Sequence, residues 1–67
     1  ELKAVVQQAL ETLPEDLRVA LTLREFDGLS YEDIANVMEC PVGTVRSRIF
    51  RAREAIDIRV KAQMEGE

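Results

Sequence analysis

The sequence predicts an all-α domain of four helices that ends in a helix-turn-helix and has no wing of β-strands. Three observations support this fold class. Apolar residues recur at helical spacing along almost the whole chain, turn-forming residues divide it at three points, and no stretch alternates apolar and polar residues as a strand would. With 67 residues, the chain has room for one domain, residues 1–67, with a thin core.

The first predicted helix extends from about Leu2 to Thr12. Its apolar residues share a helical spacing: Leu2, Val5, Val6, Ala9, Leu10 and Leu13. Pro14 ends this helix, because proline disfavours helical conformation in the residue before it. Since the chain begins inside this helix, we expect it to be a fragment of a longer protein.

The second predicted helix begins at Pro14 and extends to about Phe26. Proline fits an early helical position, and acidic residues follow it at the positive end of the helix. The apolar residues are Leu17, Ala20, Leu21, Leu23 and Phe26. Asp27 and Gly28 end the helix, since glycine adopts the left-handed cap conformation at little cost.

The third and fourth predicted helices are separated by Glu39-Cys40-Pro41. The third extends from Tyr31 to about Met38, and Ser30 and Asp33 form a capping box before it, with Asp in place of Glu. The fourth starts near Val42 and continues to about Gln63. Its apolar stripe comprises Val45, Ile49, Ala52, Ile56 and Val60.

Residues 30–53 match the requirements of a helix-turn-helix, which needs a short helix, a tight turn and a second helix at a steep angle. We expect Ala35 at the contact between the helices, where a larger side chain would separate them. Cys40 is expected to fill the turn as a small buried residue, and Val45 to hold the second helix against the first. The predicted core of the motif is Ile34, Ala35, Met38, Cys40, Val45 and Ile49.

The charge of the chain is unevenly distributed. The net charge is −4, but residues 1–40 carry three basic and nine acidic residues, whereas residues 41–67 carry six basic and four acidic ones. Residues 46–53 contain four arginines and no acid. Screening limits charge effects to about 8 Å at physiological salt, so the local patch predicts phosphate binding despite the acidic total. A solvated helix face is the alternative reading of such a patch.

The side of the fourth helix opposite its apolar stripe is the candidate DNA-reading face. A recognition helix places its N-terminal half in the major groove, where Arg pairs with guanine, Ser or Thr bonds to several bases, and Phe contacts a thymine methyl. Residues of these types point outward: Arg46, Ser47, Phe50 and Arg51, with Thr44 at the flank. Gly43 removes bulk where the helix end approaches DNA.

Supporting contacts are predicted around this face. Arg48 and Arg53 lie further round the helix and suit either phosphates or ion pairs with the acidic second helix. The amide groups near Ser30 and Tyr31, at the start of the third helix, suit a phosphate. Tyr31 itself is better explained as a packed residue at the helix start than as a platform for base stacking.

The composition excludes several classes of function. One cysteine and no histidine leave no internal disulfide, no usual zinc site and no Cys–His or Ser–His pair. Neighbouring acids along a helix diverge, so no catalytic dyad is expected. No apolar run approaches the roughly 20 residues that cross a bilayer. We therefore expect an intracellular, reduced protein with no cofactor, metal site, enzymatic activity or membrane insertion.

Three runs of the sequence resemble one protein family. They are LPEDLR at residues 13–18, LSYEDIA at 29–35 and CPVGTVRSRIFRAR at 40–53. Together they closely resemble region 4 of bacterial extracytoplasmic-function sigma factors, in particular the sigma-E/AlgU group. The resemblance covers almost the whole chain. Its most specific part is the Pro-Val-Gly-Thr-Val turn combined with the arginine pattern that follows it.

The resemblance implies a cytoplasmic domain that binds the upstream (−35) promoter element as a monomer. It also implies docking on the flap of the RNA polymerase β subunit and sequestration by an anti-sigma factor, through the apolar parts of the first two helices and the far end of the fourth. The tail from Ile58 departs from the family, and region 2, which melts promoter DNA, is missing. The resemblance assigns base reading to Arg46, Ser47, Phe50 and Arg51, and supporting or backbone contacts to Thr44, Arg48 and Arg53.

Two other functions fit the same fold. The output domain of a response regulator also binds DNA through a helix-turn-helix, but it would dimerise on paired half-sites. A protein-interaction module whose helix-turn-helix no longer reads DNA would bind it weakly and without sequence preference.

Overall fold

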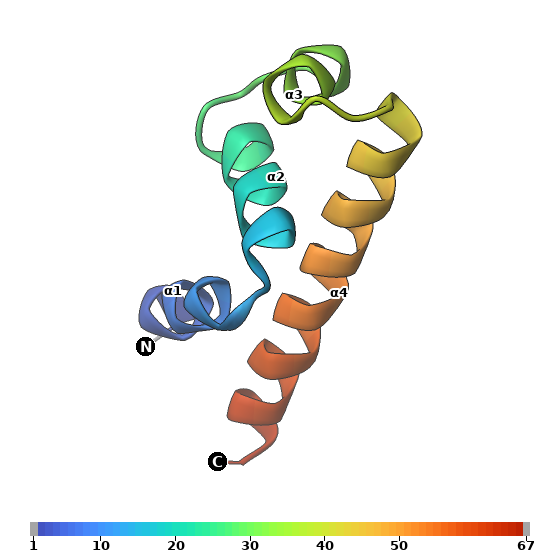
Figure 1. Cartoon of the computed structure of the whole chain (residues 1–67). Helices are drawn as coiled ribbons and strands as arrows, with labels where there is room; N and C mark the ends of the chain where they lie inside the picture. The colour runs from blue at the N-terminus through green and yellow to red at the C-terminus, as the bar shows by residue number, and fades with distance from the viewer. Residues whose placement is uncertain (1, 67) are drawn as a thin grey trace.

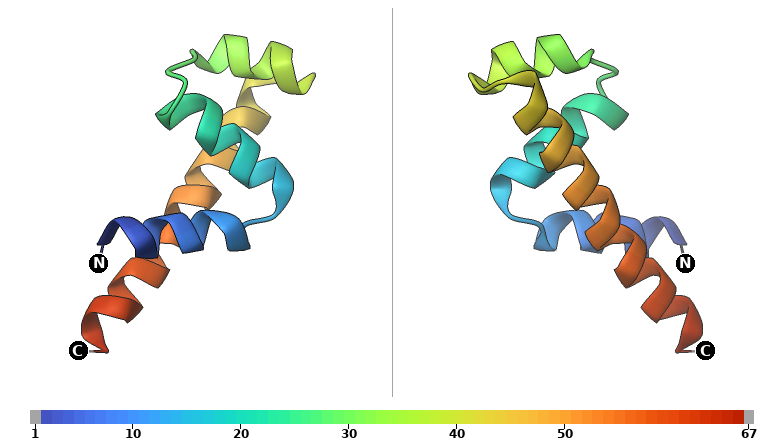
Figure 2. Two further views of the ribbon diagram at one scale, coloured as in Figure 1. Left: turned by 90° about the vertical axis from the view of Figure 1, so that its left-hand side faces the viewer. Right: turned by 90° about the vertical axis from the view of Figure 1, so that its right-hand side faces the viewer.

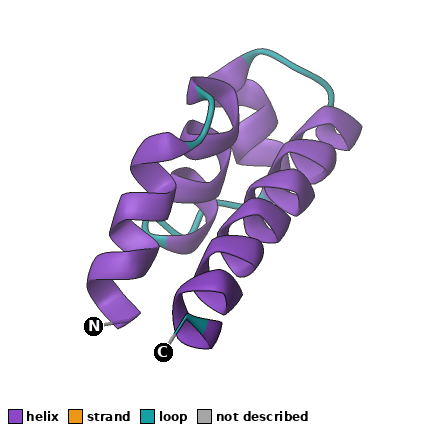
Figure 3. Cartoon of the chain, turned by 90° about the horizontal axis from the view of Figure 1, so that it is seen from below, coloured by secondary structure: helices purple, strands orange, loops and turns teal. Residues whose placement is uncertain are grey.

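The computed structural model describes residues 2–66, and these residues form four α-helices and no strand. The elements are α1 (Leu2–Thr12), α2 (Glu15–Glu25), α3 (Tyr31–Met38) and α4 (Val42–Glu65). Figure 1 shows their order, and Figure 3 shows that short loops join them. The predicted all-α class is confirmed. No helix in this described part has the length and apolarity needed to cross a membrane.

The long helix α4 organises the fold. It contacts α1, α2 and α3, and α2 also contacts α3. In the side views of Figure 2, α3 lies across the beginning of α4 and α1 crosses it further along, with α2 between them. The first turns of α4 therefore stand at the end of the molecule that carries α3, which is the arrangement expected for residues 30–53.

Local interactions fix the ends of α3. The Ser30 Oγ accepts a hydrogen bond from the backbone N–H of Asp33 at 3.1 Å, which is the first bond of the predicted capping box. The helix ends at Met38, and its C-cap Glu39 adopts the left-handed conformation with φ 55° and ψ 52°. This single residue turns the chain toward Pro41, after which α4 begins.

The end of α2 differs slightly from the prediction. The helix ends at Glu25 rather than Phe26. Phe26 was predicted among the apolar residues of this helix, but it is the C-cap and its side chain is 67% exposed. Gly28 follows with φ 70°, a conformation that glycine adopts without the steric cost of a side chain.

The core lies between α4 and the other three helices. Its buried members are Ala9, Leu13, Ala20, Leu21, Ile34, Ala35, Val45, Ile49 and Ala52. Two residues of the predicted motif core, Met38 and Cys40, are only half-buried, because the turn lies at the edge of the fold. On α4, Ile56 and Val60 are also half-buried, and the helix continues past Gln63 to Glu65. The side chain of Leu2 lies outside the described residues.

Candidate nucleic-acid interface

One side of α4 is held in the core while the other is open to solvent. Val45 and Ile49 are almost completely buried. Arg46 and Arg51 are exposed on the opposite side and flank, and the Phe50 side chain is 67% exposed although it is aromatic. Residues three and four apart are neighbours on a helix surface, so the predicted base-reading set forms one continuous face. That set is Arg46, Ser47, Phe50 and Arg51, all exposed.

The first turn of α4 is open and carries no acidic residue. A Cβ atom added at Gly43 would meet no heavy atom within 4 Å, so the surface in front of this turn is free. Pro41 is the N-cap and its carbonyl accepts bonds from the N–H groups of Thr44 and Val45 at 3.0 and 3.2 Å. Because the first turn carries no acid, the positive end of the helix dipole is not neutralised by the helix itself and favours an anion.

The Tyr31 ring lies close to two arginines from different helices. The guanidinium carbon of Arg24 is 4.8 Å from the centroid of the Tyr31 ring, and that of Arg46 is 5.7 Å away. Arg24 also donates a hydrogen bond from Nη1 to the Leu29 carbonyl at 2.9 Å. The structure thus brings Tyr31 next to the base-reading face. Arg24 was missed in the sequence, because two arginines among the three acids of α2 give no signal for one of them.

Arg48 lies on the other flank of α4, away from this face. Its Nε is 3.7 Å from Asp16 Oδ2, and its Nη1 is 3.7 Å from the Cys40 sulfur and 3.9 Å from that of Met38. The side chain is only 25% exposed. Arg48 therefore joins α4 to α2 and to the turn, which is the second of the two roles predicted for it.

Arg53 forms an ion pair with Glu25 at the end of α2. The hydrogen bond that Arg53 donates to Glu25 raises the pKa of the guanidinium above its ordinary value, against a smaller opposing effect of desolvation. Both side chains remain about half exposed. The guanidinium of Arg53 therefore stays positively charged beside the Glu25 carboxylate.

Thr44 and Ser30 are also predicted to contact the DNA backbone. Thr44 is half-buried at the start of α4. Ser30 is exposed, but its hydroxyl oxygen already accepts the capping bond from Asp33. Their backbone contacts with DNA stay a prediction.

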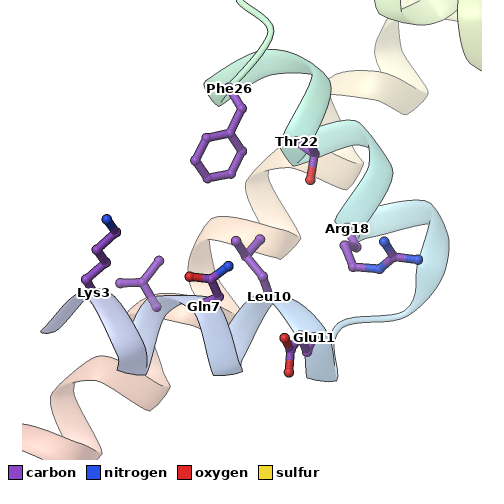
Figure 4. Close-up of a pocket in the computed structure, with 8 residues that line it drawn as sticks. Lys3, Gln7, Leu10, Glu11, Arg18, Thr22 and Phe26 are labelled. Atoms are coloured by element: carbon purple, nitrogen blue, oxygen red, sulfur yellow. The ribbon is translucent and has the colours of Figure 1, made fainter. Parts of the chain in front are cut away.

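A second surface feature lies between α1 and α2. A groove of about 820 Å³ opens there. Figure 4 shows Phe26 from the end of α2 and Leu10 from α1 pointing into the space between the two helices. The residues that line it are Lys3, Val6, Gln7, Leu10, Glu11, Arg18, Thr22 and Phe26. Val6, Leu10 and Phe26 are among the apolar residues of the first two helices, where the family resemblance implies a partner surface; that role stays a prediction.

Comparisons with known proteins agree with this geometry. Residues 3–56 match the family described as "Sigma-70, region 4". The chain is similar to the RNA polymerase sigma-H factor of Pseudomonas aeruginosa, with 79% identity over 57 residues that cover 85% of this chain and 30% of that protein. It is also similar to the ECF RNA polymerase sigma-E factors of Escherichia coli K12 and Salmonella typhimurium LT2, with 70% identity over 61 residues, 91% of this chain and 32% of each relative. The chain thus spans about a third of the length of these curated relatives.

Proposed function

Because the chain belongs to the sigma-70 region 4 family, we propose that it recognises the upstream (−35) element of promoters for a sigma factor. One observation carries this proposal. The exposed face of α4 presents Arg46, Ser47, Phe50 and Arg51 together, on a helix whose other side is fixed in the core. The proposed role is binding and positioning, with no chemical step.

The geometry suits reading in the major groove. The N-terminal half of α4 enters the groove, and the open surface at Gly43 lets the helix end approach closely. Arg46 and Arg51 have the fork of donors that pairs with the O6 and N7 of guanine, Ser47 bonds to a base edge, and Phe50 contacts a thymine methyl. Arginine is suited to this task because its guanidinium is planar and always charged.

Phosphate contacts around the groove set the position of the domain. We assign these to the backbone amide groups at the start of α3, near Ser30 and Tyr31, and to the side chains of Thr44 and Arg53, which border the base-reading face. Arg48 takes a smaller part, since Asp16 and the turn already hold its side chain. A module with so few phosphate contacts binds DNA weakly when isolated, and its affinity falls as salt rises.

The proposed protein partners use other surfaces. The groove between α1 and α2, with the exposed Phe26 at its rim, suits the β flap of RNA polymerase or an anti-sigma factor. The names of the relatives mention RNA polymerase, which supports a polymerase partner, whereas the β flap and the anti-sigma factor rest on the family resemblance of the sequence. In this role the domain acts in the cytoplasm and binds one promoter element as a monomer.

A DNA-binding titration at low salt tests the proposed function. The domain is titrated with a duplex carrying a GGAACTT-type element, which the family resemblance implies, and with a scrambled duplex. We expect preference for the element, and loss of that preference in Arg46→Ala and Arg51→Ala. Arg59→Ala is the matched control, because Arg59 is an exposed arginine of α4 far from its N-terminal half.

Each other outcome identifies an alternative. Equal binding of both duplexes would reject base reading and leave the protein-interaction module. Two domains bound to paired half-sites would favour the response-regulator type. Equal losses in all three variants would show that only the total positive charge matters.

A further inference from the structure

We propose that Tyr31 is a positioning residue for DNA reading, whose ring holds the guanidinium of Arg46 in place while Arg24 holds the ring. This inference rests on the proposed function and adds two residues to its machinery. Arg24 belongs to α2, Tyr31 to α3 and Arg46 to α4. The stack therefore joins three helices beside the base-reading face. Neither Arg24 nor Tyr31 needs to touch a base for this role.

The ring is held firmly enough to act as a platform. Tyr31 is half-buried and packs against the core. It is the first residue of α3 and directly follows the Ser30 cap, whose Oγ accepts a hydrogen bond from the Asp33 N–H at 3.1 Å and so fixes the start of the helix. Arg24 also contacts the ring: its guanidinium carbon is 4.8 Å from the ring centroid, and its Nη1 donates to the Leu29 carbonyl at 2.9 Å. The loop before α3 and the ring are thus tied to α2.

An aromatic ring is a suitable holder for an arginine that reads DNA. Arg48 and Arg53 are both paired with acids of α2, and a paired acid competes with phosphate or base. Within residues 2–66, Arg46 has no such ion pair, and its guanidinium carbon lies 5.7 Å from the Tyr31 centroid. A cation–π contact orients the guanidinium without neutralising its charge. The Arg46 side chain is thereby restricted in conformation before it binds DNA, so it loses less conformational entropy on binding.

The expected size of the effect follows from the strength of the contact. An exposed cation–π pair corresponds to about two- to five-fold in an equilibrium constant. We expect Tyr31→Leu, which keeps apolar bulk but removes the ring, to weaken binding to the element by about this factor. Tyr31→Phe keeps the ring and should bind as the unchanged chain does. Neither variant should alter binding to scrambled DNA.

A double-mutant cycle separates this role from simpler ones. Tyr31→Leu and Arg46→Ala are combined, and element affinity is measured for the four proteins. If Tyr31 acts through Arg46, the Tyr31→Leu change has no further effect in the Arg46→Ala background. A full additional loss there would overturn the proposal and show a general effect on the fold. Weaker binding of Tyr31→Phe to both duplexes would also overturn it, because the hydroxyl would then be a phosphate contact.

A measurement without DNA keeps this test independent of the proposed function. In the NMR spectrum of the free chain, the Arg46 Hδ protons should show a ring-current shift that persists in Tyr31→Phe and disappears in Tyr31→Leu. In Arg24→Gln the shift should diminish. Unshifted Arg46 protons in the unchanged chain would reject the stack itself. A shift together with no preference for the element would reject the proposed function and, with it, the role of the stack in reading DNA.

Discussion

The backbone N–H of Cys40 donates a hydrogen bond to the carbonyl of Ala35 at 3.0 Å, and this bond closes the turn between the two helices of the motif. It reaches back across the end of α3 to a carbonyl that also accepts a hydrogen bond from the Glu39 N–H. The bond requires the intervening Glu39 to adopt the left-handed conformation, at φ 55°. The geometry of the turn therefore depends on a residue that is poorly suited to it.

Glu39→Gly should stabilise the domain. The left-handed conformation costs a residue with a side chain about 1–2 kcal/mol, and glycine avoids this cost. Part of the gain is offset by the greater freedom of glycine in the unfolded chain, so we expect a net increase of about 0.5–1 kcal/mol in the free energy of unfolding. Urea denaturation measures it. Glu54→Gly, at an exposed position inside α4, is the control and should lower stability by about 0.5 kcal/mol. A decrease in both variants would contradict the assigned turn conformation.

Ala35→Leu should force α3 and α4 apart. Ala35 is buried among the core residues where the helices of the motif meet, so additional methylene groups have no space. Overpacking of this kind costs about 1–3 kcal/mol. Thermal denaturation is the measurement, and Val37→Leu on the exposed side of α3 is the control. An unchanged melting temperature in Ala35→Leu would place the contact between the helices elsewhere.

Arg48→Ala should mainly lower the stability of the fold, whereas Arg51→Ala should mainly weaken DNA binding. Arg48 packs its stem on the turn and pairs with Asp16, so its loss should destabilise the fold by about 1 kcal/mol and change the preference for the promoter element little. Arg51 is exposed, so its loss should leave stability unchanged, weaken element binding by about 1–3 kcal/mol and relax the preference at one base position. Denaturation and titration of both variants provide the comparison. Equal loss on scrambled DNA in Arg51→Ala would reduce that residue to a phosphate contact.

Most of the fold follows from local sequence signals. Four residues mark the ends of helices, each through its own backbone or side-chain chemistry: Pro14, Gly28, Ser30 and Pro41. The apolar stripe of α4 also predicted which side is buried, since Val45, Ile49 and Ala52 are core residues. Because a helix has a fixed period, the buried side of α4 also determines which positions are exposed, including those of the predicted base-reading face.

Contacts between helices were harder to predict. The sequence pattern did not distinguish between phosphates and the acids of α2 as partners of Arg48 and Arg53. Only the packing of α2 against α4 brings Asp16 and Glu25 to these arginines. Phe26 was assigned to the helix from its spacing, but the chain turns at that residue and exposes it. The approach of Arg24 to Tyr31 depends on the loop between α2 and α3, which periodicity does not describe.

Gly43→Ala should raise the stability of the domain while weakening its binding to DNA. Gly43 is inside α4, its φ is in the ordinary range, and an added Cβ meets no atom within 4 Å, so alanine should raise the free energy of unfolding by about 0.5–1 kcal/mol. If the first turn of α4 approaches DNA closely, the same methyl group should weaken binding to the element. Gly28→Ala is the matched control, because φ 70° there makes alanine destabilising despite the open space. Stronger or unchanged DNA binding in Gly43→Ala would show that the helix end stays away from the groove.

The ion pair between Arg53 and Glu25 allows a test of whether Arg53 contacts the phosphate backbone of DNA. If Arg53 binds a phosphate, Arg53→Ala should weaken binding to the element and to scrambled DNA equally, and the slope of log affinity against log salt should fall by about one. Glu25→Gln should do the reverse, because it frees Arg53 and removes a negative charge beside it. The exposed pair adds only about 0.2–1 kcal/mol to stability, so both variants should remain folded. Asp57→Asn, which removes an acid paired with Lys61 on the same helix, measures the effect of net charge alone. An equal gain in Glu25→Gln and Asp57→Asn, with no loss in Arg53→Ala, would assign Arg53 to holding α2 against α4 and not to DNA.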